Sequence, residues 1–132
     1  MVLVFLLMIL LHIIDDFVLQ SASLVKLKQE SFWKNDPVGK DPLYKNDYKV
    51  ALAVHGLSWS IMIHLPLIFL QFWHDYPYME WFLFGSVILH AVLHALIDNL
   101  KANFHKINLV QDQWYHFVQI CSLLFLWLAF TE

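Results

Sequence analysis

One apolar stretch, residues 89–101, carries four polar side chains at helical spacing. They are His90, His94, Asp98 and Lys101, in the pattern His-x3-His-x3-Asp-x2-Lys. Positions four apart drift only about 40° around an α-helix, and Lys101 returns to within about 20° of His90. One helix face would therefore hold two imidazoles and a carboxylate, which are groups that bind transition metals or carry protons.

Three further apolar segments carry side chains of the same kind. These are His12, Asp15, Asp16 and Gln20 in the first segment, His55 in the second, and Asp112, Gln113 and His116 in the last. Chain direction alternates between the segments, yet most of these groups fall about 5–15 Å from the lysine-rich boundary at 1.5 Å rise per residue. A carboxylate near the middle of a membrane helix costs about 2.5–3.5 kcal/mol unless it meets a partner. The pattern predicts that the polar faces of all four segments meet in one cluster.

Histidine together with carboxylate suits zinc, iron or manganese rather than calcium or magnesium alone. The predicted ligands are His12, Asp16, His55, His94, Asp98, Asp112 and His116, with His90 either a further ligand or a supporting residue. Four ligands satisfy a structural zinc ion. The surplus predicts two divalent ions, zinc most readily, that share a bridging carboxylate and activate water. Asp15 is the predicted general base, and Lys101 is the predicted site for a substrate anion.

Other interpretations of the same residues remain open. The cluster can be a hydrogen-bonded polar core, although serine, threonine, asparagine and glutamine are the usual residues for that task. It can also relay protons or ions. A bis-histidine haem would leave the carboxylates without a role. His64 lies on the face opposite His55 and is expected to pack, whereas His74 and His105 are expected in solvated loops.

The composition is that of an integral membrane protein. Of 132 residues, 60% are hydrophobic and only 14% charged, and tracts of about 20 apolar residues can cross a bilayer. We predict one all-α domain, an antiparallel four-helix transmembrane bundle with helices at about 1–25, 47–73, 79–101 and 109–130. Pro66 should kink or end the second helix. The net charge of −3 does not indicate nucleic-acid binding, and the lone Cys121 excludes a disulfide framework.

The lysines predict the topology. All eight basic residues are lysines, and each lies in or beside the loops 26–49 and 101–108. By the positive-inside rule those loops face the cytoplasm and both termini face outward across the cytoplasmic (inner) membrane. The first segment contains Asp15 and Asp16 with no preceding Lys or Arg, which favours a membrane helix over a cleaved signal peptide.

The chain resembles a known family in four features that follow one another along the sequence. They are HIIDDFVLQ at 12–20, the isolated His55, HAVLHALIDNLK at 90–101 and DQWYH at 112–116. Over essentially its whole length the chain resembles a family of small bacterial and phage membrane proteins known only as a domain of unknown function. That resemblance implies a four-helix membrane protein and brings no activity with it. The chain is also distantly similar to membrane-bound metal-dependent hydrolases, in which His and Asp on apolar helices serve as metal ligands.

We therefore expect a membrane-embedded metal-dependent hydrolase that acts on a phosphoester, such as a lipid head group or a nucleotide. The outer halves of the four segments are almost wholly apolar, which favours a pocket open on the cytoplasmic side only. The alternative is a non-enzymatic membrane protein, either a subunit of a metal or proton transporter or channel, or a metal-sensing interaction protein. Expected partners are the lipid bilayer and a phosphate-bearing small molecule or lipid, with a homo-oligomer left open.

Overall fold

The computed structural model describes residues 1–131, and this part of the chain contains helices and no strand. Four helical segments are long and apolar enough to cross a membrane. They are Val2–Leu19, which joins α1 (Val2–Ile13) to the π-helix η1 (Ile14–Leu19), followed by α4 (Asp47–His74), α5 (Met79–Ala102) and α6 (Leu109–Thr131). Two short helices, α2 (Ala22–Leu27) and α3 (Glu30–Asn35), lie between the first and second of these segments.

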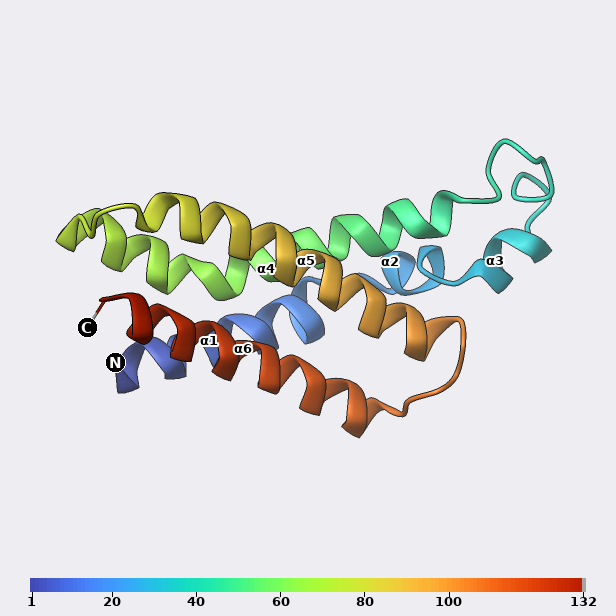
Figure 1. Cartoon of the computed structure of the whole chain (residues 1–132). Coiled ribbons are helices and arrows are strands. Elements are labelled where there is room, and N and C mark those ends of the chain that lie inside the picture. The colour runs from blue at the N-terminus through green and yellow to red at the C-terminus, as the bar shows by residue number, and fades with distance from the viewer. Residues whose placement is uncertain (132) are drawn as a thin grey trace.

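The long helices lie lengthwise against one another (Figure 1). α5 packs along α4, and α1 packs against both α4 and α6. The two termini lie near each other at one end of the molecule, close to the turn between α4 and α5. The α2–α4 connection and the loop between α5 and α6 lie at the opposite end. The chain thus has a terminal end and a loop end.

The all-helical class and the four long apolar helices agree with the sequence prediction, whereas several details differ. The first segment ends at Leu19 instead of continuing to residue 25, because Ser21 caps a separate helix by accepting a hydrogen bond from the Leu24 backbone N–H. The expected polar loop contains both α2 and α3. α4 continues through Pro66 to His74, where Asp75 in the left-handed conformation (φ 48°) ends it.

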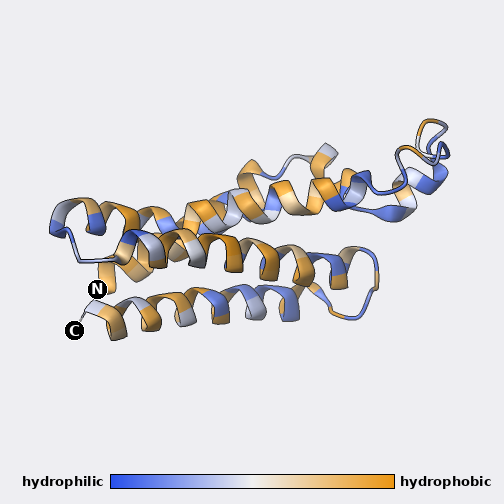
Figure 2. Cartoon of the chain, turned by 45° about the horizontal axis from the view of Figure 1, so that its top comes forward, coloured by the Kyte–Doolittle hydropathy of each residue, from blue (hydrophilic) through white to orange (hydrophobic). Residues whose placement is uncertain are grey.

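The outward surface of the long helices is apolar. Figure 2 shows hydrophobic colouring along these helices and hydrophilic colouring concentrated in the connection that contains α3. Phe72 is 81% exposed, and Trp81 and Phe125 are each 71% exposed. Large apolar side chains exposed along all four long segments are unfavourable in water and suited to lipid or to a protein partner.

The core divides into an apolar half and a polar half. The apolar half consists of Met8, Trp59, Ile63, Leu67, Met79, Leu83, Ile120, Leu123 and Trp127. These residues come from α1, the middle of α4, the start of α5 and the second half of α6, so they fill the terminal end. The opposite halves of the same helices supply most of the buried histidines and aspartates. The fold therefore collects its polar core groups towards the loop end.

Candidate metal centre

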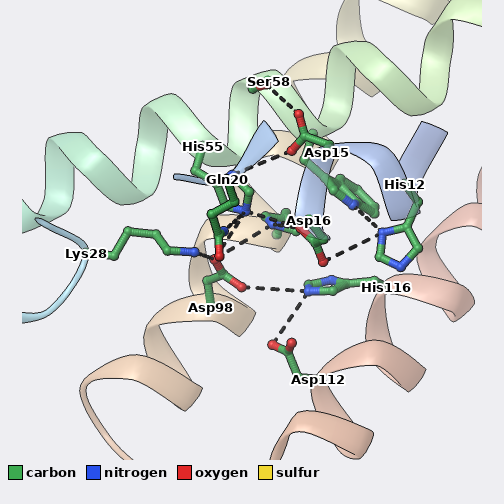
Figure 3. A network of polar contacts seen from close by, with 12 residues as sticks. His12, Asp15, Asp16, Gln20, Lys28, His55, Ser58, Asp98, Asp112 and His116 are labelled. Atoms are coloured by element: carbon green, nitrogen blue, oxygen red, sulfur yellow. Dashed lines mark hydrogen bonds and ion pairs between the residues drawn. The ribbon is translucent and has the colours of Figure 1, made fainter. Parts of the chain in front are cut away.

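Imidazoles and carboxylates from four helical segments converge in the polar half of the core (Figure 3). They come from α1 and η1, α4, α5 and α6. Asp15 and Asp16 are consecutive in the sequence, yet the side chain of Asp15 is 2% exposed and that of Asp16 only 8%. Both lie in the π-helical turn η1. Single π turns are rare and concentrate at functional sites.

The first group of possible ligand atoms joins η1, α4 and α5. Asp16, His55 and His94 each offer one ligand atom, and these atoms lie within 4.8 Å of one another. Asp16 Oδ1 is 3.3 Å from His55 Nε2 and 3.9 Å from His94 Nε2. The Gln20 amide lies 2.8 Å from His55 Nε2. An ion bound to that nitrogen would take the place of this hydrogen bond.

The second group joins α5 and α6 and shares His94 with the first. His94, Asp98 and His116 again offer atoms within 4.8 Å of one another. Asp98 Oδ2 is 3.8 Å from His94 Nε2, and Asp98 Oδ1 is 3.7 Å from His116 Nε2. His94 and Asp98 are four residues apart on α5, so the helical spacing noticed in the sequence brings them to one site.

Several atoms of this cluster are buried without a hydrogen-bond partner among the described residues. They are Asp15 Oδ2, Asp16 Oδ1, both ring nitrogens of His94, Asp112 Oδ1 and His116 Nε2. Native proteins pair the great majority of such atoms. The unpaired atoms of Asp16, His94 and His116 belong to the two groups just described, and these three residues lie on three different helical segments.

The spacing of these atoms is near that of ligands around one metal ion. Ligands about 2.0–2.2 Å from a tetrahedral zinc ion stand about 3.3–3.6 Å apart. The nitrogen–oxygen separations in the two groups run from 3.3 to 3.9 Å. A contraction of a few tenths of an ångström would bring them into coordination. The donor set of imidazole and carboxylate fits zinc, iron or manganese.

Asp15 lies next to the Nδ1 atom of His55 and belongs to neither group of ligand atoms. Its Oδ1 accepts a hydrogen bond of 2.6 Å from the Ser58 hydroxyl, and its Oδ2 lies 3.5 Å from His55 Nδ1. A carboxylate on the far nitrogen of a metal-binding imidazole fixes the orientation of the ring. This position suits an orienting residue better than the general base expected from the sequence.

His12 uses both ring nitrogens for hydrogen bonds. The Trp59 indole N–H donates to His12 Nδ1 at 2.7 Å, and His12 Nε2 lies 3.1 Å from Gln113 Oε1. Gln113 in turn donates to Asp16 Oδ2 at 3.2 Å. Because an indole nitrogen can only donate, the proton of a neutral His12 sits on Nε2. His12 therefore supports Asp16 through Gln113 and lies outside both groups of ligand atoms.

His90 also lies outside both groups. Its Nδ1 is 2.8 Å from the Ser86 carbonyl oxygen, and its ring meets that of His64 edge-on at 5.4 Å. His64 itself is fully buried and bonded to the Ser60 carbonyl and the Ser86 hydroxyl. These residues form a second polar layer, one helical turn closer to the terminal end than His94.

Two lysines complete the cluster. The Lys101 ammonium pairs with Asp112 Oδ2 at 2.5 Å, and Asp112 Oδ1 lies 3.5 Å from His116 Nε2. The Lys28 ammonium pairs with Asp98 Oδ2, also at 2.5 Å. Sequence reasoning missed Lys28, since it appeared to be one of several lysines in a polar loop. It also missed Trp59 and Ser58, whose roles depend on contacts between helices.

Comparison of the chain with protein-family models, with curated proteins and with solved structures found no match.

Proposed function

We propose that this chain crosses the cytoplasmic membrane four times as an antiparallel bundle, with the loops 26–49 and 101–108 in the cytoplasm. The length and hydropathy of the four segments support this arrangement, as do the exposed apolar side chains along them. All eight basic residues belong to sequence that lies at or near the loop end. Basic residues of this kind stay on the cytoplasmic side during insertion.

We propose further that Asp16, His55, His94, Asp98 and His116 bind a divalent transition metal. One observation carries this proposal: Asp16 Oδ1, His94 Nε2 and His116 Nε2 are buried and lack a hydrogen-bond partner among residues 1–131. Each such atom costs roughly 1–3 kcal/mol when left unpaired. A cation bound beside His94 would satisfy His94 Nε2 together with Asp16 Oδ1 or with His116 Nε2, because each of these pairs belongs to one group of ligand atoms.

The activity that this centre supports best is hydrolysis of a phosphoester by a metal-activated water. A metal bound by imidazoles and carboxylates lowers the pKa of its bound water and stabilises negative charge in the transition state. The polar half lies towards the lysine-rich loop end, within reach of lipid head groups or cytosolic phosphates. The apolar half of the core closes the terminal end, which supports a site open on one side.

Two residues beside the centre fit roles in that reaction. Asp112 Oδ1 is buried and unpaired among the described residues, 3.5 Å from His116 Nε2, so we assign Asp112 as the general base. Lys101 keeps 33% of its side chain exposed although it contacts Asp112. Its ammonium can therefore turn towards a substrate phosphate without a large change in burial.

Asp98→Asn tests the hydrolase assignment, with Asp75→Asn in the exposed α4–α5 turn as the matched control. Detergent-purified proteins would be loaded with zinc or manganese and assayed on bis(p-nitrophenyl) phosphate and on phospholipid micelles. The assignment predicts that Asp98→Asn loses at least about 100-fold in kcat while Asp75→Asn matches the wild type, because one ligand change alters the charge at the reacting centre. Equal rates for both variants with metal retained would contradict it.

The second polar layer favours one alternative, a transporter of protons or metal ions. His64 and His90 extend the buried polar groups beyond His94 towards the terminal end. The apolar residues Leu67, Leu83 and Trp127 lie beyond that layer and are expected to block passage. Purified protein in liposomes loaded with a zinc-sensitive dye distinguishes the two functions. The hydrolase assignment predicts no zinc entry above that of empty liposomes, whereas saturable entry would favour the transporter.

A further inference from the structure

Lys28 is a buried lysine that reaches the candidate metal centre from outside the four long helices. It follows the last residue of α2 and is only 4% exposed. In Figure 3 its side chain extends from the connection between helices, and its ammonium points at Asp98. A lysine is almost never buried to this extent unless it has a charged partner.

Asn103, just after α5, fixes the backbone on both sides of Lys28. The Asn103 side-chain N–H donates to the Lys28 carbonyl at 3.0 Å, and Asn103 Oδ1 accepts from the Glu30 backbone N–H at 2.7 Å. The same amide contacts Asn99 Oδ1 at 2.7 Å. These hydrogen bonds hold the junction of α2 and α3 against the end of α5, the helix that carries Asp98. The backbone at Lys28 is therefore fixed beside the cluster.

The two groups of ligand atoms do not provide two independent metal sites. Both include His94, and its Nε2 is the nitrogen that faces Asp16 and Asp98. One imidazole nitrogen has one lone pair and binds one ion. A second ion would need Asp98 together with His116. Asp98 Oδ1 lies 3.7 Å from His116 Nε2, but the other oxygen of the same carboxylate already pairs with the Lys28 ammonium, so its negative charge is shared with a cation.

The charges of the cluster also favour one bound metal ion over two. Asp15, Asp16, Asp98 and Asp112 carry four negative charges when ionised, and Lys28 and Lys101 carry two positive charges. With neutral histidines, the form that binds metal, one divalent ion balances the cluster. Two ions would leave an excess of two positive charges in a buried site, which is strongly unfavourable.

We propose that the Lys28 ammonium takes the place of a second metal ion at Asp98, so that the centre binds a single divalent ion. This inference rests on the proposed metal centre and replaces the two ions expected from the sequence. In hydrolases with two metal ions, the second ion helps to hold an oxygen of the substrate or leaving group. Lys28 supplies a positive charge on the same Asp98 carboxylate, and this charge cannot dissociate as a bound ion can.

The test is metal stoichiometry in four proteins: wild type, Lys28→Met, Lys28→Arg and Lys26→Met. Methionine keeps much of the apolar stem of Lys28 and removes its charge, and arginine keeps the charge. Lys26 is an exposed lysine of α2, the helix that Lys28 follows. Each full-length protein would be stripped with chelator in detergent, incubated with excess zinc or manganese, desalted and measured by mass spectrometry. Circular dichroism of each variant would establish that the helices are retained.

The inference predicts about one equivalent of metal in wild type, Lys28→Arg and Lys26→Met, and close to two in Lys28→Met. Two equivalents in the wild type would overturn it, as would one equivalent in folded Lys28→Met. Metal in none of the four proteins would overturn the metal centre as well as this inference. The role of Lys28 can therefore fail while the centre stands, and the two failures give different results.

Discussion

The imidazole rings of His94 on α5 and His116 on α6 stack face to face, with centroids 4.1 Å apart and planes 24° apart. The stack aims both Nε2 atoms at Asp98, which lies 3.8 Å from one and 3.7 Å from the other. Two charged imidazolium rings at this distance would repel each other, so the stack disfavours the state in which both rings are charged. Neutral imidazole is the form that binds metal ions, and the packing of α5 against α6 places both rings where the proposed metal ion would lie.

Trp59 contacts two histidines of the cluster. Its substitution by phenylalanine removes the indole N–H and keeps an aromatic ring at this position. The indole stacks on His94 at 4.3 Å and donates to His12. Trp59→Phe should weaken zinc binding by about 10-fold, because the partners that orient metal ligands typically contribute 10–100-fold to affinity. Competition with a zinc-binding dye measures this change. The exposed Trp81→Phe is the control, and equal affinity in both variants would rule out this role for Trp59.

Gly56 permits close approach of α4 to α5 immediately beside His55. A Cβ atom at this position would lie 2.5 Å from the Ala91 carbonyl oxygen and 3.2 Å from the Ala95 side chain. Gly56→Ala should destabilise the protein by about 1–3 kcal/mol, because overpacking forces the helices apart. Gly85→Ala is the matched control, since a Cβ there meets no described atom within 4 Å. Thermal unfolding in detergent should show a lower Tm for Gly56→Ala only.

The proposed topology can be tested with single cysteines, because the chain contains only one natural cysteine, Cys121. In a Cys121→Ser background, Lys40→Cys reports on the α2–α4 connection and Asp75→Cys on the α4–α5 turn. A membrane-impermeant maleimide applied to intact spheroplasts should label Asp75→Cys and leave Lys40→Cys unlabelled until the cells are lysed. Labelling of Lys40→Cys before lysis, with Asp75→Cys protected, would reverse the orientation.

The sequence predicts the long helices because their signal is local. Largely apolar runs between polar loops predict α4, α5 and α6 to within one or two residues of their observed bounds. The spacing of His94 and Asp98 also predicts that they share a face, since that relation lies within one helix. The same reasoning does not predict η1, because a π turn adds one residue per turn without an evident signal in the apolar residues around Asp15 and Asp16.

Residues that reach the cluster from another part of the chain are harder to predict. Lys28 and Asp98 are 70 positions apart, and no sequence pattern around either residue predicts that they form an ion pair. His12 has the spacing of a ligand relative to Asp16, yet Trp59 and Gln113 occupy both of its nitrogens. Sequence spacing shows which helix face a residue occupies, whereas its hydrogen-bond partners depend on how the helices pack.

The metal centre is tested most directly by the metal content of wild type, His94→Ala and His74→Ala, purified in detergent without chelator. His94 belongs to both groups of ligand atoms, whereas His74 is exposed at the end of α4. We expect bound zinc, iron or manganese at about one equivalent in wild type and His74→Ala, and less than about a tenth of that in His94→Ala. Wild-type protein that is folded and free of metal, or His94→Ala that retains its full metal content, would show that these residues do not form a metal centre.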